Sequence, residues 1–343
     1  MKKNKFMYIN PIFFFIPLVL LFLHYGEFFL VPVSISLFIF IIIKSISSKL
    51  IYLFKDKINV QINNFFSLLL IFSLFFLIIY FTWEVLKFNI INVSQKANLY
   101  QENLIAISNK ISENAMIKIM NPIIQSIENI DIGNLFTLIL GSLTSFAGSF
   151  TLVLVYIFFF IAEEKFFIQK IKKVSKNKKT LQIINKINLD IYNYFQLKSL
   201  TSFLTGILTF SLLFFINCDL SILFGILAFF LNFIPFLGSI LAVIFPFIFV
   251  CIQFLDILQP LIVLFSLILI QILVGNILEP KIIGKSLNLS PLIMIIVLSI
   301  MGKLWGIIGM FLSIPFLVVL LIVFSNFKST QKIALFISER GES

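Results

Sequence analysis

Long apolar runs that carry few charges constrain the fold of this chain more than any other feature of its sequence. They occupy residues 11–23, 28–43, 65–83, 136–161, 200–216, 221–255, 261–278 and 291–325. A helix needs about 20 apolar residues to cross the hydrocarbon core of a bilayer. Only 12% of the residues are charged, whereas a soluble domain carries about a quarter. The sequence therefore predicts an all-α, polytopic integral membrane protein whose surroundings are the lipid bilayer.

The positions of the lysines predict the topology, because short cytoplasmic connections of membrane proteins are enriched in Lys and Arg. Lysines lie in the N-terminal segment, in residues 44–64 and in residues 163–198, so these parts are expected inside. The link 24–27 has no lysine and is expected outside, so the first two apolar runs are predicted to form a hairpin. Residues 1–83 thus form a set of N-terminal transmembrane helices. The first of them is expected to be retained, because no signal-peptide cleavage site follows it.

Residues 84–135 are polar, nearly charge-balanced and expected outside. Apolar side chains recur in this segment at three- and four-residue steps, which predicts an amphipathic helix with one apolar stripe. The stripe contains Val93, Ala97, Tyr100, Leu104, Ile107, Ile111 and Ala115. Two interpretations fit it: the helix lies on the membrane surface, or it packs against a neighbouring subunit of a homo-oligomer.

Residues 136–327 hold the remaining apolar runs and the connection 163–198, which carries nine lysines. A charge run of this kind is usually a solvated face that flanks the membrane. The second half of the connection is predicted to be an amphipathic helix. Its apolar face contains Ile184, Ile187, Ile191 and Tyr194. The tail 328–343 carries further basic residues and is expected inside.

Two of the apolar runs are too long for one ordinary crossing and are interrupted by Gly and Pro. Run 221–255 is broken by the Ile-Pro-Phe-Leu-Gly sequence at 234–238, and run 291–325 by Gly-Lys-Leu-Trp-Gly at 302–306. A break within the bilayer is tolerated only where protein or a water-lined cavity covers it. Each half is short for a full span, which predicts two helical hairpins; two kinked full spans are the alternative. The predicted turn residues are Pro235, Gly238, Gly302, Gly306 and Pro315.

The order of these elements predicts an inverted repeat. Run 200–216 crosses outward and precedes a hairpin that opens to the outside. Run 261–278 crosses inward and precedes a hairpin that opens to the inside. Paired Gly- or Pro-interrupted segments at corresponding positions are a pointer to the binding site of a secondary transporter.

Ionisable and polar residues inside or beside the apolar runs are the candidates for a substrate or ion pathway, because such groups are costly in a membrane. Glu279 and Lys281 are expected either to form a pair or gate, or to mark a helix end at the interface. Lys303, in the second break, faces the pathway or extends to the membrane surface. The uncharged candidates are Asn232, Gln271 and Asn276, which bind a polar substrate or tie helices together.

Several segments of the last 200 residues resemble the autoinducer-2 exporter family of bacterial membrane transporters. They are Tyr-Asn-Tyr-Phe-Gln-Leu-Lys at 192–198, Asn-Phe-Ile-Pro-Phe-Leu-Gly at 232–238, Leu-Glu-Pro-Lys-Ile-Ile-Gly at 278–284, Leu-Ser-Pro at 289–291, Gly302 to Gly309, and Ile314-Pro315. The resemblance implies a multi-pass protein of the bacterial cytoplasmic membrane. It also implies a secondary transporter that exports a small polar molecule such as this quorum-sensing signal. Other family members are assigned to sodium–proton exchange, so a cation/proton antiporter is the alternative function.

Motifs of other protein classes are absent from the sequence. It contains no P-loop, no H-E-x-x-H and no G-x-S-x-G, and Cys218 and Cys251 do not form a C-x-x-C pair. We therefore expect no catalytic residue, no cofactor and no metal site, and transport that is driven by an ion gradient or runs downhill. The net charge is +11, but the basic residues flank membrane segments, so nucleic acid is not an expected partner.

Overall fold

A computed structural model describes residues 12–57, 63–112, 131–174, 178–283, 288–327, 329–339 and 341. In these residues every regular element is a helix, short turns join the helices, and the one β contact is an isolated bridge. Six helices are long and apolar enough to cross a membrane. They are Glu27–Asp56, Asn64–Ser94, Ile132–Phe166, Thr180–Phe215, Leu258–Ile282 and Pro291–Asn326. The prediction of an all-α polytopic membrane protein is confirmed.

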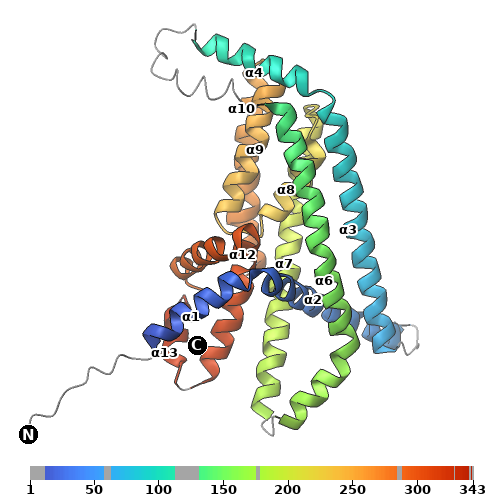
Figure 1. The fold of residues 1–343 in the computed structure, drawn as a ribbon, viewed down its shortest axis with the longest axis vertical. Helices are drawn as coiled ribbons and strands as arrows, with labels where there is room; N and C mark the ends of the chain where they lie inside the picture. The colour runs from blue at the N-terminus through green and yellow to red at the C-terminus, as the bar shows by residue number, and fades with distance from the viewer. Residues whose placement is uncertain are drawn as a thin grey trace, which may run out of the picture.

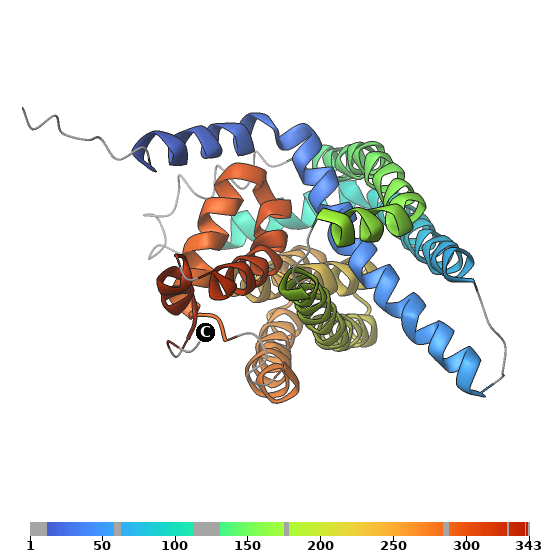
Figure 2. The same ribbon diagram turned by 90° about the horizontal axis from the view of Figure 1, so that it is seen from below.

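The helices form a long bundle with transverse helices at one side. Their bounds are α1 Ile12–Tyr25, α2 Glu27–Lys57, α3 Asn64–Ser94, α4 Ala97–Ser112, α6 Ile132–Val174, α7 Lys178–Phe215, α8 Ser221–Leu231, α9 Leu237–Gln253, α10 Leu258–Gln271, the π-helix η2 Ile272–Leu278, α11 Glu279–Ile283, α12 Pro291–Asn326 and α13 Gln331–Ile337. Helices α3, α6 and α7 run along the long axis, with α4 across one end and the α6–α7 corner at the other (Figure 1). Helices α1 and α2 lie across that axis and are seen lengthwise in Figure 2.

Helices α1 and α2 do not form the predicted hairpin. The amide of Gly26 donates to the carbonyl of Phe22 at 2.9 Å, and the amide of Leu30 donates to the carbonyl of Gly26 at 2.9 Å. Helical hydrogen bonding therefore continues through the link, and the two helices meet at an open angle (Figure 2). The prediction was wrong because no residue of the link takes a positive φ, so the backbone stays helical there and the chain does not reverse.

The connections predicted as loops at the lysine-rich end are largely helical. Helix α2 continues to Lys57, and α6 and α7 continue to Val174 and from Lys178, so most of 44–64 and 163–198 is helix. The predicted amphipathic face is the start of α7, where Ile191 and Tyr194 are buried. Lys44 of α2 pairs with Glu164 of α6 at 2.8 Å, which ties the two helices together at this end.

The apolar stripe of the segment 84–135 packs against the chain's own helices. Helix α3 continues to Ser94 and α4 follows after a two-residue turn, so the stripe is divided between two helices. Val93, Tyr100 and Leu104 are buried in one cluster with Leu213 and Phe224. Neither sequence interpretation anticipated this packing, because one placed the stripe against the membrane surface and the other against a neighbouring subunit. The end of the stripe, at Ala115, lies outside the described residues.

Run 221–255 forms the first predicted hairpin, made of α8 and α9. The two helices pack against each other and are joined by residues 232–236. A Cβ atom at Gly238 would overlap the carbonyl oxygen of Leu231, so this glycine permits the close approach of the two arms. The left-handed residue of the turn is Phe236, with φ of 61°. Gly238 thus serves the close packing of the two arms and does not supply the positive φ of the turn.

Run 291–325 forms the second hairpin within α12. Helical backbone geometry is interrupted at Trp305 and at Gly306, whose φ is 60° and ψ is −145°. Met301 and Gly309 would lie about 12 Å apart along a straight helix, yet a Cβ atom at Gly309 would overlap the carbonyl oxygen of Met301. The chain therefore folds back on itself at this point, and the alternative of a single kinked span is wrong. Pro315 is buried in the second arm.

The two hairpins contact each other from opposite ends of the molecule. Helices α8 and α9 lie in the upper half of Figure 1 and α12 in the lower half. Leu231 and Ile234, at the turn of the first hairpin, pack against Leu298 of the first arm and Met310 of the second arm of α12. This opposed arrangement is the one that an inverted repeat requires.

A short C-terminal strap, residues 331–339, is fastened to the segment that leads into α12. The amide of Ser290 donates to the carbonyl of Ile337 at 2.9 Å. The amide of Glu339 donates to the carbonyl of Asn288 at 3.2 Å. Ala334 and Ile337 are buried. Part of the predicted cytoplasmic tail is therefore packed structure, while Lys328 and Arg340 lie outside the described residues.

Which end of the bundle faces the cytoplasm stays a prediction, and it has a direct test. Glu102 belongs to α4 and Lys170 to the last turns of α6. Helix α4 and the α6–α7 corner lie at opposite ends of the long axis (Figure 1), so a cysteine is introduced at each residue in a chain lacking Cys218 and Cys251. An impermeant maleimide added to right-side-out vesicles is expected to label Glu102→Cys at once and Lys170→Cys only after permeabilisation. Labelling of both from one side contradicts the predicted topology.

Candidate functional site

One face of α7 carries a row of buried polar side chains. Its members follow three- and four-residue steps, so they share one side of the helix. They are Lys198, Thr201, Ser202, Thr205 and Thr209. Thr201 and Thr205 donate back to carbonyls of α7 itself. The hydroxyl of Thr209 is buried and has no hydrogen-bond partner in the described part of the chain.

Lys198 and Glu279 form a buried ion pair between α7 and the start of α11. The Nζ atom of Lys198 lies 2.5 Å from Oε1 of Glu279, and their side chains are 7% and 21% exposed. Lys198 lies near the middle of the candidate span Thr180–Phe215. Burying two charges costs several kcal/mol per ion, which the pair offsets only while both partners remain in place. The pair is therefore sensitive to any movement of α11 relative to α7.

A π-helix directs Glu279 toward α7. Residues 272–278 form η2, and the amide of Glu279 donates to the carbonyl of Val274, five residues earlier. Pro280 follows at once; it has no N–H, and its ring would crowd the preceding turn of a regular α-helix. Wide π-turns inside helices are frequent at functional sites. The wide turn thus accommodates Pro280 and sets the side on which the carboxylate emerges.

The turn of the first hairpin is tied to α7 by hydrogen bonding and close packing. Asn232 Nδ2 donates to the hydroxyl of Ser202 at 3.0 Å, and both side chains are buried. One turn further along α7, a Cβ atom at Gly206 would lie 2.8 Å from the carbonyl oxygen of Gly225 in α8. Asn232 thus joins the turn of the first hairpin to α7.

An aromatic cluster joins α7 to both hairpins beside the ion pair. Phe233 of the first turn lies 5.0 Å from Phe311 of α12, measured between ring centroids. Phe195 of α7 lies 6.3 Å from each of them. Because Lys198 follows Phe195 by one helical turn, the ion pair lies next to the place where the two hairpins meet.

The other predicted pathway residues are not gathered at this place. Lys281 and Lys303 are exposed, and Asn276 is exposed on η2. Gln271 is half-buried at the end of α10. In the described residues Glu279 pairs with Lys198 rather than with Lys281.

Lys198 is the functional candidate that the sequence analysis missed. It counted this residue among the nine solvated lysines of the connection 163–198, whereas the structure buries it. One signal could have found it: Lys198 starts the row of Ser and Thr at helical spacing that continues into an apolar run. That spacing marks a lysine on the polar face of a membrane helix.

The fold and this site define a polytopic helical membrane protein of the transporter class, in which two interrupted hairpins meet beside a buried ion pair. The model of the AI-2E family transporters matches residues 12–329. The chain belongs to this family of transporters.

Named relatives agree with this assignment. A Borreliella burgdorferi protein, provisionally named a transport protein, is 37% identical over 57% of this chain and 56% of its own length. The AI-2 transport protein TqsA of Escherichia coli is 32% identical over 60% of each chain. A Haemophilus influenzae protein, also provisionally named a transport protein, is 29% identical over 90% of each. The chain thus spans a little under two thirds of the length of the first two relatives.

Proposed function

We propose that the chain is a secondary transporter of the bacterial cytoplasmic membrane that exports a small polar molecule related to autoinducer-2. The relative named as an AI-2 transport protein supports this class of substrate. The row of buried hydroxyls on α7 supports a polar substrate, since the hydroxyl of Thr209 is buried without a partner in the described residues. A buried hydroxyl in that condition costs free energy unless something hydrogen-bonds to it.

The observation that carries the proposal is the Lys198–Glu279 pair. A buried ionisable pair next to the apolar runs of a membrane protein is expensive, and such a pair is a candidate for a pathway or coupling site. It joins α7 to α11 next to the contact between the hairpins, so a movement of either hairpin changes the surroundings of both charges. Such a pair links substrate passage to proton or cation movement.

A flux measurement in proteoliposomes tests the proposal. Vesicles loaded with autoinducer-2 are expected to lose it at least tenfold faster with the protein than without it. An imposed proton gradient is expected to change this rate. Release equal to that of protein-free vesicles contradicts export of this molecule.

The same vesicles test the alternative function, a cation/proton antiporter, which the half-buried, ion-paired Glu279 carboxylate favours. Sodium-dependent proton movement in the absence of any organic solute would support that alternative. Loss of this movement in Glu279→Gln would assign it to the ion pair.

A further inference from the structure

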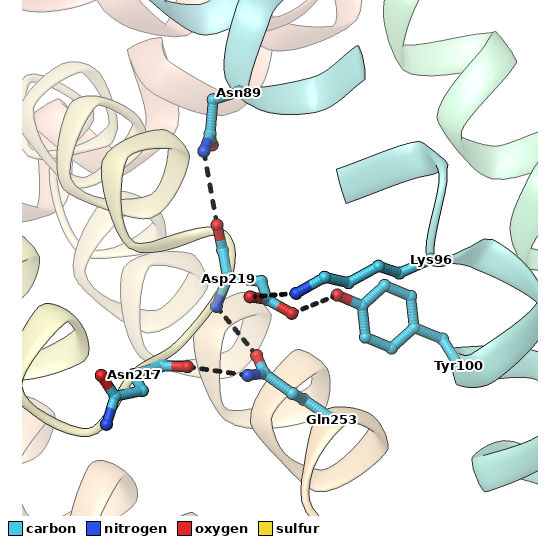
Figure 3. A network of polar contacts seen from close by, with 6 residues as sticks. All are labelled: Asn89, Lys96, Tyr100, Asn217, Asp219 and Gln253. Carbon is cyan, nitrogen blue, oxygen red and sulfur yellow. Dashed lines mark hydrogen bonds and ion pairs between the residues drawn. The ribbon is translucent and has the colours of Figure 1, made fainter. Parts of the chain in front are cut away.

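At the end of the bundle that carries α4, a polar cluster joins three separate parts of the chain around Asp219 (Figure 3). Asp219 lies in the link between α7 and α8. Its carboxylate contacts Lys96 Nζ at 2.8 Å and accepts a hydrogen bond from the hydroxyl of Tyr100 at 2.6 Å. Its backbone carbonyl accepts from Asn89 Nδ2 at 3.3 Å, and its amide donates to Gln253 Oε1 at 3.0 Å.

The cluster is fastened to the end of α9 as well. Gln253 Nε2 donates to the carbonyl of Asn217 at 2.8 Å, so one amide side chain holds both sides of the α7–α8 link. Asn103 of α4 donates to the carbonyls of Ile252 and Gln253. The corner between α3 and α4 is thereby bonded to both ends of the first hairpin.

The buried side chains of helix α3 lie near its two ends, and none from 72 to 89 is buried. Toward its start, Ile71 shares a cluster with residues of α2 and α6, and toward its end Ile90 shares one with Phe224 of α8. The α3–α4 corner is therefore the place where helix α3 can hold or release the first hairpin.

The strengths of the bonds around Asp219 differ with their exposure. Lys96 is half-exposed, and an ion pair in that position contributes little on its own. Tyr100 is almost completely buried. Burial and the neighbouring Asp219 carboxylate raise the pKa of Tyr100 well above its ordinary value, so its hydroxyl remains a donor. A hydrogen bond from a buried hydroxyl to a carboxylate is among the stronger ones in proteins.

We propose that this cluster is a latch in which Asp219 keeps the end of the α8–α9 hairpin closed against the α3–α4 corner, and that the latch opens when this end opens for transport. Asp219 is a positioning residue here and need not touch the substrate. The proposal requires an opening at this end and does not depend on which solute is carried.

Cys218 is a native reporter of the latch, because it is adjacent to Asp219 and 4% exposed. Burial, with a smaller contribution from the Asp219 carboxylate, raises the pKa of its thiol to about 12 from 9.0. Maleimides react with the thiolate, so alkylation of closed Cys218 at neutral pH is expected to be slow, and an opening that exposes the thiol is expected to raise its rate.

The test measures maleimide alkylation of purified protein that lacks Cys251 and keeps Cys218. Tyr100→Phe keeps the Asp219 charge and is expected to raise the rate severalfold, so it reports opening directly. Asp219→Asn is expected to raise the rate at least tenfold, because it opens the latch and also removes a charge that raises the thiol pKa. Lys96→Gln is expected to have the smallest effect. The matched control is Asp256→Asn. Within the described residues this exposed carboxylate accepts hydrogen bonds from the amides of Ile257 and Leu258, and its removal is expected to leave the rate unchanged.

A second reporter separates a latch from general loosening. Ser47 is fully buried on α2, far from the cluster. In a chain whose only cysteine is introduced as Ser47→Cys, Asp219→Asn is expected to change alkylation less than twofold. Equal increases at both reporters overturn the latch. So does an unchanged Cys218 rate in both Asp219→Asn and Tyr100→Phe.

Discussion

Replacing Glu279 by Gln is expected to reduce transport at least tenfold while the protein still inserts into the membrane. The substitution leaves the ammonium group of Lys198 buried without its partner. Breaking a buried ion pair from one side costs about 3–5 kcal/mol. Lys198→Met is expected to have a comparable effect on transport. Flux from proteoliposomes and thermal unfolding in detergent measure the two consequences separately.

A double substitution decides whether this pair serves function or stability. Well-packed apolar residues often replace a buried pair at no cost, so Lys198→Met/Glu279→Met is expected to regain the unfolding temperature of the parent chain. Transport is expected to remain lost. Recovery of transport together with stability would show that the charges only hold the helices together. Asp256→Asn, at an exposed carboxylate in the α9–α10 link, is the control for removing an acidic group.

Replacing Gly238 by Ala is expected to impair the protein more than the same change at Gly306. At Gly238 the added methyl group would overlap a backbone carbonyl, so the arms of the first hairpin must separate. At Gly306 there is space for it, but φ of 60° with ψ of −145° is a conformation that costs other residues about 1–3 kcal/mol. Larger side chains such as Leu at Gly238 are expected to displace the arms of the first hairpin, in addition to any obstruction of the substrate pathway.

Gly141 provides the matched control, because it lies within α6 with no atom within 4 Å of an added Cβ. Ala in place of an unconstrained helical glycine stabilises by up to about 1 kcal/mol. The expected order of transport and of unfolding temperature is therefore Gly141→Ala highest, Gly306→Ala intermediate and Gly238→Ala lowest. Equal behaviour of Gly238→Ala and Gly141→Ala would contradict the close approach of α8 and α9 at Gly238.

The sequence predicted the two hairpins because their signal is local. An apolar run that is too long for one span and is broken by Pro235 or Gly306 leaves few alternatives in a membrane. The roles of the glycines were less predictable. Whether a glycine permits close approach or a positive φ depends on where the second arm lies, and Phe236 takes the left-handed conformation in the first turn.

The candidate site was only partly predictable, because it joins residues that are far apart in the chain. Glu279 was recognised as an ionisable group at the end of an apolar run, but Lys198 lies 81 positions away. A count of lysines cannot distinguish a buried lysine from its solvated neighbours. The same limit explains why the cluster around Asp219 was missed: Tyr100 and Gln253 carry no pattern of their own.

The C-terminal strap has a consequence for biosynthesis. The strand-like pairing of Leu289 with Ser338 links residues 49 positions apart. A ribosome delivers the entrance of α12 to the membrane well before it delivers the partner that fastens it. During that interval the second hairpin has to rely on its own tight turn and on the first hairpin. A nascent chain arrested between these positions is therefore expected to be the one on which insertion chaperones and membrane proteases act.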